Sequence, residues 1–369
     1  MQTTVQRVIL PDNRRILMIS DIHGHASGLR TLLEDACFDE RDVLVIVGDL
    51  LEKGPENLQT VRYVMELCRR YTVYPLMGNV DLWRIECLLS DDTSVQQGMV
   101  RYSLNALKWW PSSFLGELCA ELGIELRLGM DTQTVFPLLR AHFAKELAFL
   151  QNLPVILETQ KMIFVHGGIP HERLDELEGT PAHPLMKWDH FMDEGLSFSK
   201  YVTVGHWPVM LYGEQYPCYN PIVDRQRRII SLDGGCGVKT DGQLNLIVLP
   251  DWRSDEFEHY EWTPLPVITA LDDQPETMAS GFIHWGDHLV KVLKNNGETS
   301  LVLHRGREWT VPSDFLWETN GGTGCNDFTD RRLPVERGDQ MYLINEYSFG
   351  CYVKMDGMTG WYMGRYQSE

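Results

Sequence analysis

Short apolar runs that end in polar residues recur along the first part of the chain. ILMIS, VLVIVG and YTVYPLM are each followed by a polar loop, and after the first two loops the apolar residues recur at helical spacing. Four later runs, KMIFV, KYVTV, RRIIS and QLNLIVL, have the same strand pattern. Strands that alternate with helices predict an α/β domain whose polar side chains gather at the strand ends.

Helical spacing dominates one stretch of this part of the chain. Residues 82–150 carry Leu, Trp and Met at helical spacings with few strand signals, so we expect a helical insertion lying over the strand ends. The strand pattern then resumes until Pro250, after which a polar segment marks a change of domain. The pattern therefore predicts a first domain over residues 1–250.

The C-terminal part of the sequence contains an internal repeat. The segment that starts at Gly286 corresponds without gaps to the segment that starts at Gly338. Each unit has alternating strands joined by glycine-containing turns, which predicts two small β-barrels over residues 264–318 and 319–369. One larger β-domain is the alternative.

Charge and composition narrow the range of partners. The formal net charge is −19 and both halves are acidic, which argues against binding along a nucleic-acid backbone. Small phosphorylated substrates at a metal site remain compatible, because bound cations reverse the local field. No apolar run approaches the roughly 18 residues of a membrane span, and the N-terminus lacks the layout of a signal peptide. The eight cysteines are scattered without a CxxC pair, so we expect a reduced, cytoplasmic protein that does not bind membranes.

Five loops that follow predicted strands carry side chains of the metal-ligand type. They are two aspartates, three histidines and one asparagine: Asp21, His23, Asp49, Asn79, His166 and His206. An α/β sheet brings such residues together at the ends of its strands. Oxygen and imidazole donors suit Mn, Fe, Zn or Mg, and no thiolate is needed. One such residue alone is more often a turn or cap residue, but five such loops predict a site for two metal ions.

The order of the motifs DxH, GDxxxxGP, GN, HGG and GHxP resembles that of the calcineurin-like metallophosphoesterases. Within these, the sequence looks closest to the phosphoprotein phosphatase family, with its serine/threonine phosphatases, and to the related symmetrical dinucleoside tetraphosphatases of bacteria. The resemblance covers roughly residues 14–249. It implies an α/β fold with a β-sandwich of two mixed sheets flanked by helices, and a dinuclear metal centre at one rim.

The C-terminal units resemble a different family. Segments such as GREWTVPSDFLWE and GMTGWYMGRYQ are similar to the closing strands of Src homology 3-like barrels. Such domains usually bind peptides, so the resemblance implies a peptide partner. The alternative is that the barrels only brace the catalytic domain or a dimer.

The resemblance to metallophosphoesterases also implies individual ligands. The first ion would be bound by Asp21, His23 and Asp49, and the second by Asp49, Asn79, His166 and His206. Asp49 would then bridge the two ions. Mn is the expected metal, with Fe, Zn and Mg as alternatives. Two ions about 3.5–4 Å apart would lower the pKa of a bridging water, and the resulting hydroxide would attack phosphorus.

One position departs from the family pattern. Val80 stands where the family has a histidine that donates a proton to the leaving oxygen. Glu52 stands where an acidic residue supports that histidine, and Lys53 where an arginine holds phosphate. Lys53 can still meet a phosphate oxygen as a point charge. His25 is the nearest replacement acid along the sequence, with a structural role as the alternative.

These observations predict a metal-dependent phosphoesterase that acts on a phosphorylated small molecule, a nucleotide or a phosphoprotein. Because the usual proton donor is missing, we expect aryl phosphates, activated diesters and nucleotide polyphosphates to be favoured. One alternative is a conventional protein serine/threonine phosphatase. Another is a catalytically weak, metal-bound scaffold that recruits partners through its C-terminal barrels.

Overall fold

The chain folds into two compact units in the computed structural model, which describes residues 1–278 and 281–368. The first unit contains Met1–Pro208 and Pro221–Thr263, and the second contains Val209–Asn220 and the chain from Pro264 onward. The first unit therefore extends beyond the predicted limit at residue 250. A short segment in the middle of the chain belongs to the second unit.

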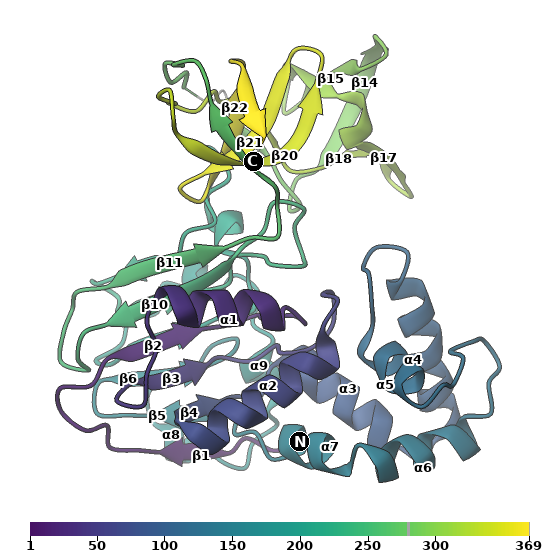
Figure 1. Ribbon diagram of the computed structural model, residues 1–369, viewed down its shortest axis with the longest axis vertical. Coiled ribbons are helices and arrows are strands. Elements are labelled where there is room, and N and C mark those ends of the chain that lie inside the picture. The colour runs from purple at the N-terminus through teal and green to yellow at the C-terminus, as the bar shows by residue number, and fades with distance from the viewer. Residues whose placement is uncertain (279–280, 369) are drawn as a thin grey trace. The chain divides into compact units, whose positions relative to one another are not determined.

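Two mixed β-sheets form the centre of the first unit (Figure 1). The five-stranded sheet has the order β11-β10-β2-β3-β4 and consists of Glu258–Trp262, Leu244–Leu249, Ile16–Ile19, Val43–Ile46 and Thr72–Pro75. The six-stranded sheet has the order β1-β5-β6-β7-β9-β8 and consists of Val5–Arg7, Ile156–Glu158, Met162–Val165, Tyr201–Val204, Ile229–Ser231 and Ile222–Asp224. Strands β2, β3 and β4 are parallel, and so are β6, β7 and β9. Within each group, the carboxyl ends therefore lie at the same edge.

Apolar side chains of both sheets meet in one core. Ile16 and Met18 of β2 pack there with Val45 of β3 and Phe164 of β6. Alternate residues of a strand point to opposite faces, and all four residues of β2 are buried. The strands read as unbroken apolar runs because both of their faces are covered. The predicted sandwich of two mixed sheets with flanking helices is confirmed.

Helices α1 (Ala26–Asp35) and α2 (Asn57–Arg70) lie along the five-stranded sheet (Figure 1). Helix α1 packs against β10 and β11, and α2 packs against β4. A Cβ atom on Gly28 of α1 would lie 2.4 Å from the Trp262 ring, so only glycine allows this close approach. Between β6 and β7 the chain forms the short helices α8 (Leu174–Leu177), α9 (His183–Met186) and η1 (Phe191–Glu194).

The predicted insertion is helical and gathers at one side of the first unit (Figure 1). Its helices are α3 (Asn79–Leu89), α4 (Thr93–Ala106), α5 (Phe114–Glu121), α6 (Thr132–His142) and α7 (Ala144–Gln151). It thus begins at Asn79, before the predicted start at residue 82. Helices α5 and α7 pack against α2. The Glu117 carboxylate of α5 accepts hydrogen bonds from the backbone N–H groups of Asn57 (2.9 Å) and Leu58 (2.7 Å), at the N-terminus of α2.

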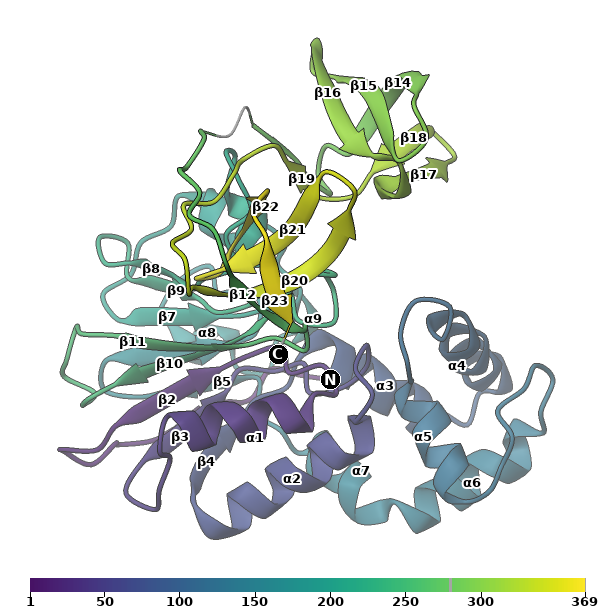
Figure 2. The same ribbon diagram turned by 45° about the horizontal axis from the view of Figure 1, so that its top comes forward.

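The second unit is built mainly of antiparallel strands (Figure 2). One sheet has the order β16-β15-β14-β18-β17 and consists of Arg307–Pro312, Thr299–His304, Leu289–Asn295, Gly322–Cys325 and Leu316–Thr319. Another has the order β22-β21-β20-β12-β23 and consists of Met358–Tyr362, Gly350–Met355, Gln340–Tyr347, Val267–Ala270 and Tyr366–Ser368. A third pairs β13 (Phe282–Ile283) with β19 (Phe328–Thr329). The 3₁₀ helices η2 (Val209–Tyr212) and η3 (Ser313–Phe315) complete the unit.

The two halves of the sequence repeat form two equivalent meanders. Strands β14, β15 and β16 pair in sequence, and so do β20, β21 and β22. Strand β12, which the boundary at residue 318 assigned to the first barrel, instead pairs with β20 and β23 of the other sheet. The first meander is therefore inserted between β12 and β20 along the chain. The sequence pattern locates strands but does not specify such long-range partners.

The segment Val209–Asn220 is held in the second unit by buried contacts. The Tyr219 N–H donates to the Gly357 carbonyl oxygen (2.8 Å), and Lys354 Nζ lies 4.6 Å from the centre of the Tyr219 ring. Met210, Tyr219 and Phe282 pack together in a small apolar cluster. These contacts explain why a segment so distant in sequence belongs to the C-terminal fold.

Candidate metal centre

All the predicted ligand residues follow strands whose carboxyl ends converge. Asp21 follows β2, Asp49 follows β3, and Asn79 begins α3 after β4. His166 and His206 follow the parallel strands β6 and β7. The topology therefore gathers residues that are distant in sequence at the same rim of the sandwich.

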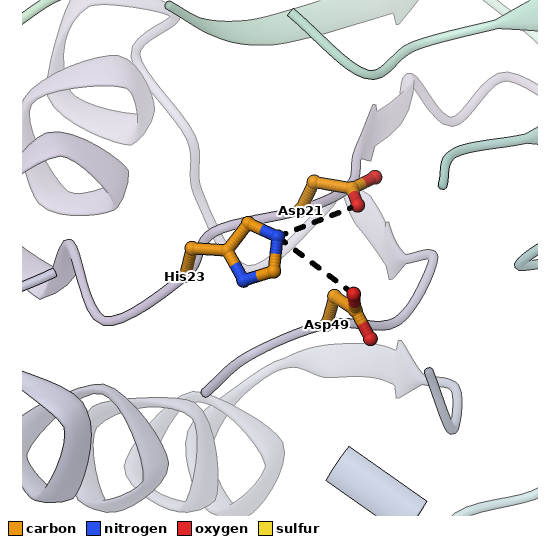
Figure 3. Close-up of side chains that lie close together, drawn as sticks. All are labelled: Asp21, His23 and Asp49. Atoms are coloured by element: carbon orange, nitrogen blue, oxygen red, sulfur yellow. Dashed lines mark ion pairs between the residues drawn. The ribbon is translucent and has the colours of Figure 1, made fainter. Parts of the chain in front are cut away.

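Asp21, His23 and Asp49 form a buried cluster (Figure 3). His23 Nε2 lies 3.8 Å from Asp21 Oδ1 and 3.7 Å from Asp49 Oδ2. No side chain of the three is more than 3% exposed. Figure 3 shows the imidazole ring facing both carboxylates. Each residue can offer a ligand atom within 4.8 Å of the others, which suits a shared cation.

Asp49 also faces a second group of donors. His166 Nε2 lies 3.4 Å from Asp49 Oδ1 and 3.1 Å from Asn79 Oδ1. The ring of His206 lies 5.4 Å from that of His166, and its backbone N–H donates to Asp21 Oδ2 (3.1 Å). The structure thus brings all six predicted ligand residues together, with the Asp49 carboxylate between the two groups.

Hydrogen bonds at the ring nitrogens determine which face each histidine presents. Nδ1 of His23 lies 2.8 Å from the Leu51 carbonyl oxygen, and Nδ1 of His166 lies 2.8 Å from that of Val47. A carbonyl accepts only, so Nδ1 of each ring donates, and Nε2 is the nitrogen that faces the cluster and would bind a metal ion. His206 has the opposite arrangement, because its Nε2 donates to the Asp189 carboxylate (2.8 Å) and its Nδ1 keeps the lone pair that could bind a metal ion.

Several residues of the cluster have a left-handed backbone conformation, which is rare for residues other than glycine. Asp21, His23, Asp49 and His206 have φ values of 52°, 45°, 53° and 65°. Left-handed non-glycine residues cost energy and concentrate at functional sites. Neighbouring glycines make room for the carboxylates: a Cβ on Gly78 would lie 2.1 Å from Asp49 Oδ1, and one on Gly205 would lie 2.2 Å from Asp21 Oδ2.

Burial and neighbouring charges shift the pKa values of the carboxylates and imidazoles in the cluster. Burial, together with the neighbouring Asp233, raises the pKa of Asp21 well above its ordinary value, and burial raises the pKa of Asp233 to about 6. Burial opposes the charge on Asp49, but His166 outweighs it and holds the pKa of Asp49 well below its ordinary value. Burial opposes the charge on His166 too, but Asp49 and Asp21 raise its pKa to about 10. Buried carboxylates with imidazole and amide donors fit divalent cations that prefer oxygen and nitrogen ligands.

Residues 14–210 match the model of a known family, the calcineurin-like phosphoesterases. This chain belongs to that family. The predicted family is therefore confirmed.

Named relatives of this chain match only part of it. A symmetrical bis(5'-nucleosyl)-tetraphosphatase of Buchnera aphidicola subsp. Schizaphis graminum is 41% identical over 68 residues, which is 18% of this chain and 24% of that protein. A protein of the same name from Pseudomonas fluorescens is 39% identical over 82 residues, 20% of this chain and 28% of that protein. The chain thus matches about a quarter of the length of these relatives. A solved serine/threonine phosphatase from Saccharomyces cerevisiae has a TM-score of 0.42 and 11% identity, covering 72% of this chain and 86% of that one.

Lys53 and His25, the other predicted site residues, have different surroundings. Lys53 Nζ lies 2.8 Å from His23 Nε2, so its positive charge faces the cluster. His25 Nδ1 lies 3.1 Å from the Ile22 carbonyl oxygen and 3.6 Å from Cys236 Sγ, and its ring packs 5.7 Å from that of Trp262. Burial lowers the pKa of His25. These contacts favour the structural alternative for His25.

Val80 contributes its backbone rather than its side chain to the centre. Its N–H donates to Asp49 Oδ1 (2.9 Å) at the start of α3. Glu52, the predicted support of a proton donor at this position, has its carboxylate paired with the buried Arg84.

Sequence reasoning missed three acidic or basic residues at the candidate metal centre. Asp189, which bonds His206, lies in the loop KWDHFMD without a preceding strand, so no pattern marked it. Asp233 follows β9 directly and carried the same strand-end signal as the predicted ligands. Arg84 lies inside α3, where a charged residue reads as part of a solvated helix face.

Two observations bear on the predicted surroundings of the protein. Across residues 1–278 and 281–368, no helix is both long enough and apolar enough to cross a bilayer. None of the eight cysteines forms a disulfide, and all of them lie in the described part of the chain.

Proposed function

We propose that this chain hydrolyses phosphoesters or phosphoanhydrides with two divalent metal ions bound by Asp21, His23, Asp49, Asn79, His166 and His206. The observation that carries the proposal is the position of Asp49, whose two carboxylate oxygens face separate groups of donors. Mn is the metal we expect, and Fe, Zn and Mg have compatible ligand preferences. A reducing, cytoplasmic location is part of the proposal.

When bound, the two ions would supply an acidified water and polarise the phosphoryl oxygens. The chain itself supplies orientation and charge. Val47 and Leu51 hold the rings of His166 and His23 through their carbonyl oxygens, and Asp189 holds the ring of His206. Lys53 offers a positive charge beside His23, where it can contact a phosphate oxygen.

Substrate preference follows from the missing proton donor. The Val80 side chain cannot transfer a proton, and Glu52 is bound by Arg84. Leaving groups that depart readily as anions need no such donor. We therefore propose a preference for aryl phosphates, activated diesters and nucleotide polyphosphates over phosphoserine peptides. The match to proteins named tetraphosphatases supports nucleotide polyphosphates among these.

The scaffold alternative rests on a cleft in the second unit. A cleft of about 410 Å³ is lined by apolar residues that include Phe328, Phe349 and Trp361, together with the charged residues Asp330 and Arg332. Its lining of apolar and charged residues suits a peptide segment. We propose that this peptide is basic or contains proline. Under this alternative the metal centre turns over slowly and the chain acts by recruiting a partner.

Turnover with added Mn²⁺ separates the enzyme from the scaffold. Asp49→Asn keeps the size of the side chain but removes the charge that faces both groups of donors, so we expect activity on an aryl phosphate to fall at least about 100-fold. Asp35→Asn, an exposed carboxylate at the end of α1, is the matched control and should act like the wild type. Equal activity in Asp49→Asn and Asp35→Asn would contradict the proposed function.

A further inference from the structure

Glu52 and Arg84 form a buried ion pair beside the metal centre. Arg84 Nε donates to Glu52 Oε1, and the two side chains are 2% and 1% exposed, with Arg84 the more exposed. The Arg84 guanidinium carbon lies 3.9 Å from the centre of the Trp83 ring and 4.1 Å from that of Tyr102. Both rings thus pack against the guanidinium and against each other, edge to face. Removing either partner of the ion pair would leave an uncompensated buried charge.

The pair joins two segments that carry predicted metal ligands. Glu52 lies in the loop that begins at Asp49 and has a left-handed backbone with φ of 70°. Arg84 lies one helical turn after Val80 on α3, the helix that begins at Asn79. The Asp81 carboxylate of α3 also accepts from the backbone N–H groups of Leu50 (3.0 Å) and Leu51 (3.1 Å). Loop and helix are thus held together by two acidic side chains.

The pair also reaches the helical insertion. Glu52 Oε1 accepts from the backbone N–H of Phe114 (3.3 Å), the first residue of α5. The other oxygen, Oε2, is buried and has no hydrogen-bond partner in the described part of the chain. Arg84 is therefore the only charged partner that the structure records for Glu52 among the described residues.

We propose that Arg84 is a positioning residue for the metal centre. By binding Glu52 it fixes the loop from Asp49 to Lys53 against α3, and it engages the carboxylate that the family pattern assigns to support of a proton donor at position 80. The inference rests on the proposed function and deepens it. In this account the absence of a histidine at position 80 and the ion pair between Glu52 and Arg84 are two parts of the same modified site.

Metal affinity is the first readout, because it does not depend on turnover. Arg84→Met removes the charge and keeps much of the side-chain volume, so Glu52 is left unpaired and the loop loses its anchor. We expect Mn²⁺ affinity, measured by calorimetry on folded protein, to fall about 10–100-fold, as for other residues that orient ligands. The double variant Glu52→Gln/Arg84→Met leaves no buried charge, and it should recover most of the affinity.

The matched control is Arg69→Met, an exposed arginine in the last turn of α2. It should bind Mn²⁺ like the wild type. A variant Arg84→Met that melts at a lower temperature but binds Mn²⁺ with unchanged affinity would overturn the proposal, because Arg84 would then be structural only. If Arg84→Met does not fold, the Mn²⁺ affinity of the double variant Glu52→Gln/Arg84→Met is compared with that of Glu52→Gln alone. Equal affinities would support the proposal that Arg84 acts through Glu52. A further 10-fold loss in the double variant would overturn it.

The second readout is the dependence of turnover on the pKa of the leaving group. Val80→His alone should keep the wild-type dependence of turnover on leaving-group pKa, because Glu52 stays paired with Arg84 and does not support the new ring. Val80→His combined with Arg84→Met frees Glu52 and should flatten the dependence. A flat dependence in Val80→His alone would overturn the proposal. A wild-type protein that binds no Mn²⁺ would instead contradict the proposed function itself, so the two failures are distinguishable.

Discussion

At the scale of single residues, the types and order of the ligands were predictable but their conformation was not. Asp21, Asp49 and His206 follow strands, and each takes a left-handed backbone that no propensity assigns to it. Asp189 reaches His206 from a loop without a strand signal. Such features depend on tertiary contacts, so the sequence indicates the donors and the fold determines their orientation.

The glycine beside Asn79 tests how tightly the centre is packed. In Gly78→Ala the new Cβ would lie 2.1 Å from Asp49 Oδ1, so the carboxylate or the start of α3 must move. We expect loss of most Mn²⁺ binding, measured as metal content per chain after gel filtration. Gly98→Ala, in α4, is the control, because the nearest side-chain atom to its new Cβ would be Arg101 Nη2, at 3.9 Å. It should keep the metal and gain up to about 1 kcal/mol of stability. Equal metal content in both variants would refute this account of the packing.

The carboxylate of Asp189 is expected to orient His206. Asp189→Ala removes the acceptor of Nε2, so the ring can turn and its Nδ1 no longer faces the centre. We expect Mn²⁺ affinity to fall about 10–100-fold, with a smaller loss in Asp189→Asn, whose amide oxygen can still accept. Calorimetric titration measures both. The control is Asp193→Ala, which removes an exposed carboxylate nearby. If the Mn²⁺ affinity of Asp193→Ala were as low as that of Asp189→Ala, Asp189 would have no specific role.

At the scale of elements, the strands buried on both faces were predicted, whereas a polar edge strand was missed. The apolar runs of β2, β3, β6, β7, β9 and β10 all form strands. Strand β11 was missed because its sequence, EHYEW, is polar: it lies at the edge of its sheet and is only partly buried. The insertion was recognised as helical, but its first helix starts at Asn79 because that residue belongs to both the helix and the site.

The junction between α5 and α2 gives a test at this scale. Glu117 accepts from the first backbone N–H groups of α2, where a negative charge is favourable. Glu117→Ala should lower the free energy of unfolding by about 1–2 kcal/mol through loss of this cap. Urea unfolding followed by far-ultraviolet circular dichroism measures the change. Glu125→Ala, exposed in the loop after α5, should cost almost nothing, and equal costs for the two variants would rule out the capping role.

At the scale of the whole molecule, the two-part organisation was visible in the sequence, but its boundaries were not. The repeat located two meanders, yet β12 pairs with the second of them and Val209–Asn220 joins the C-terminal unit. Both features are long-range pairings, which local patterns do not encode. The likeness of this unit to Src homology 3-like barrels and its peptide partner stay predictions.

The central claim is that the metal centre works without a general acid. Its most direct measurement is kcat/KM with Mn²⁺ across a series of phosphates whose leaving groups span a wide range of pKa, with Asp49→Asn as the background. A general acid is worth about 10²–10⁴ in rate, and most for poor leaving groups. The account predicts a steep fall in kcat/KM as the pKa of the leaving group rises, with alkyl phosphates the poorest substrates. A flat dependence would mean that another residue donates the proton, and it would contradict the account.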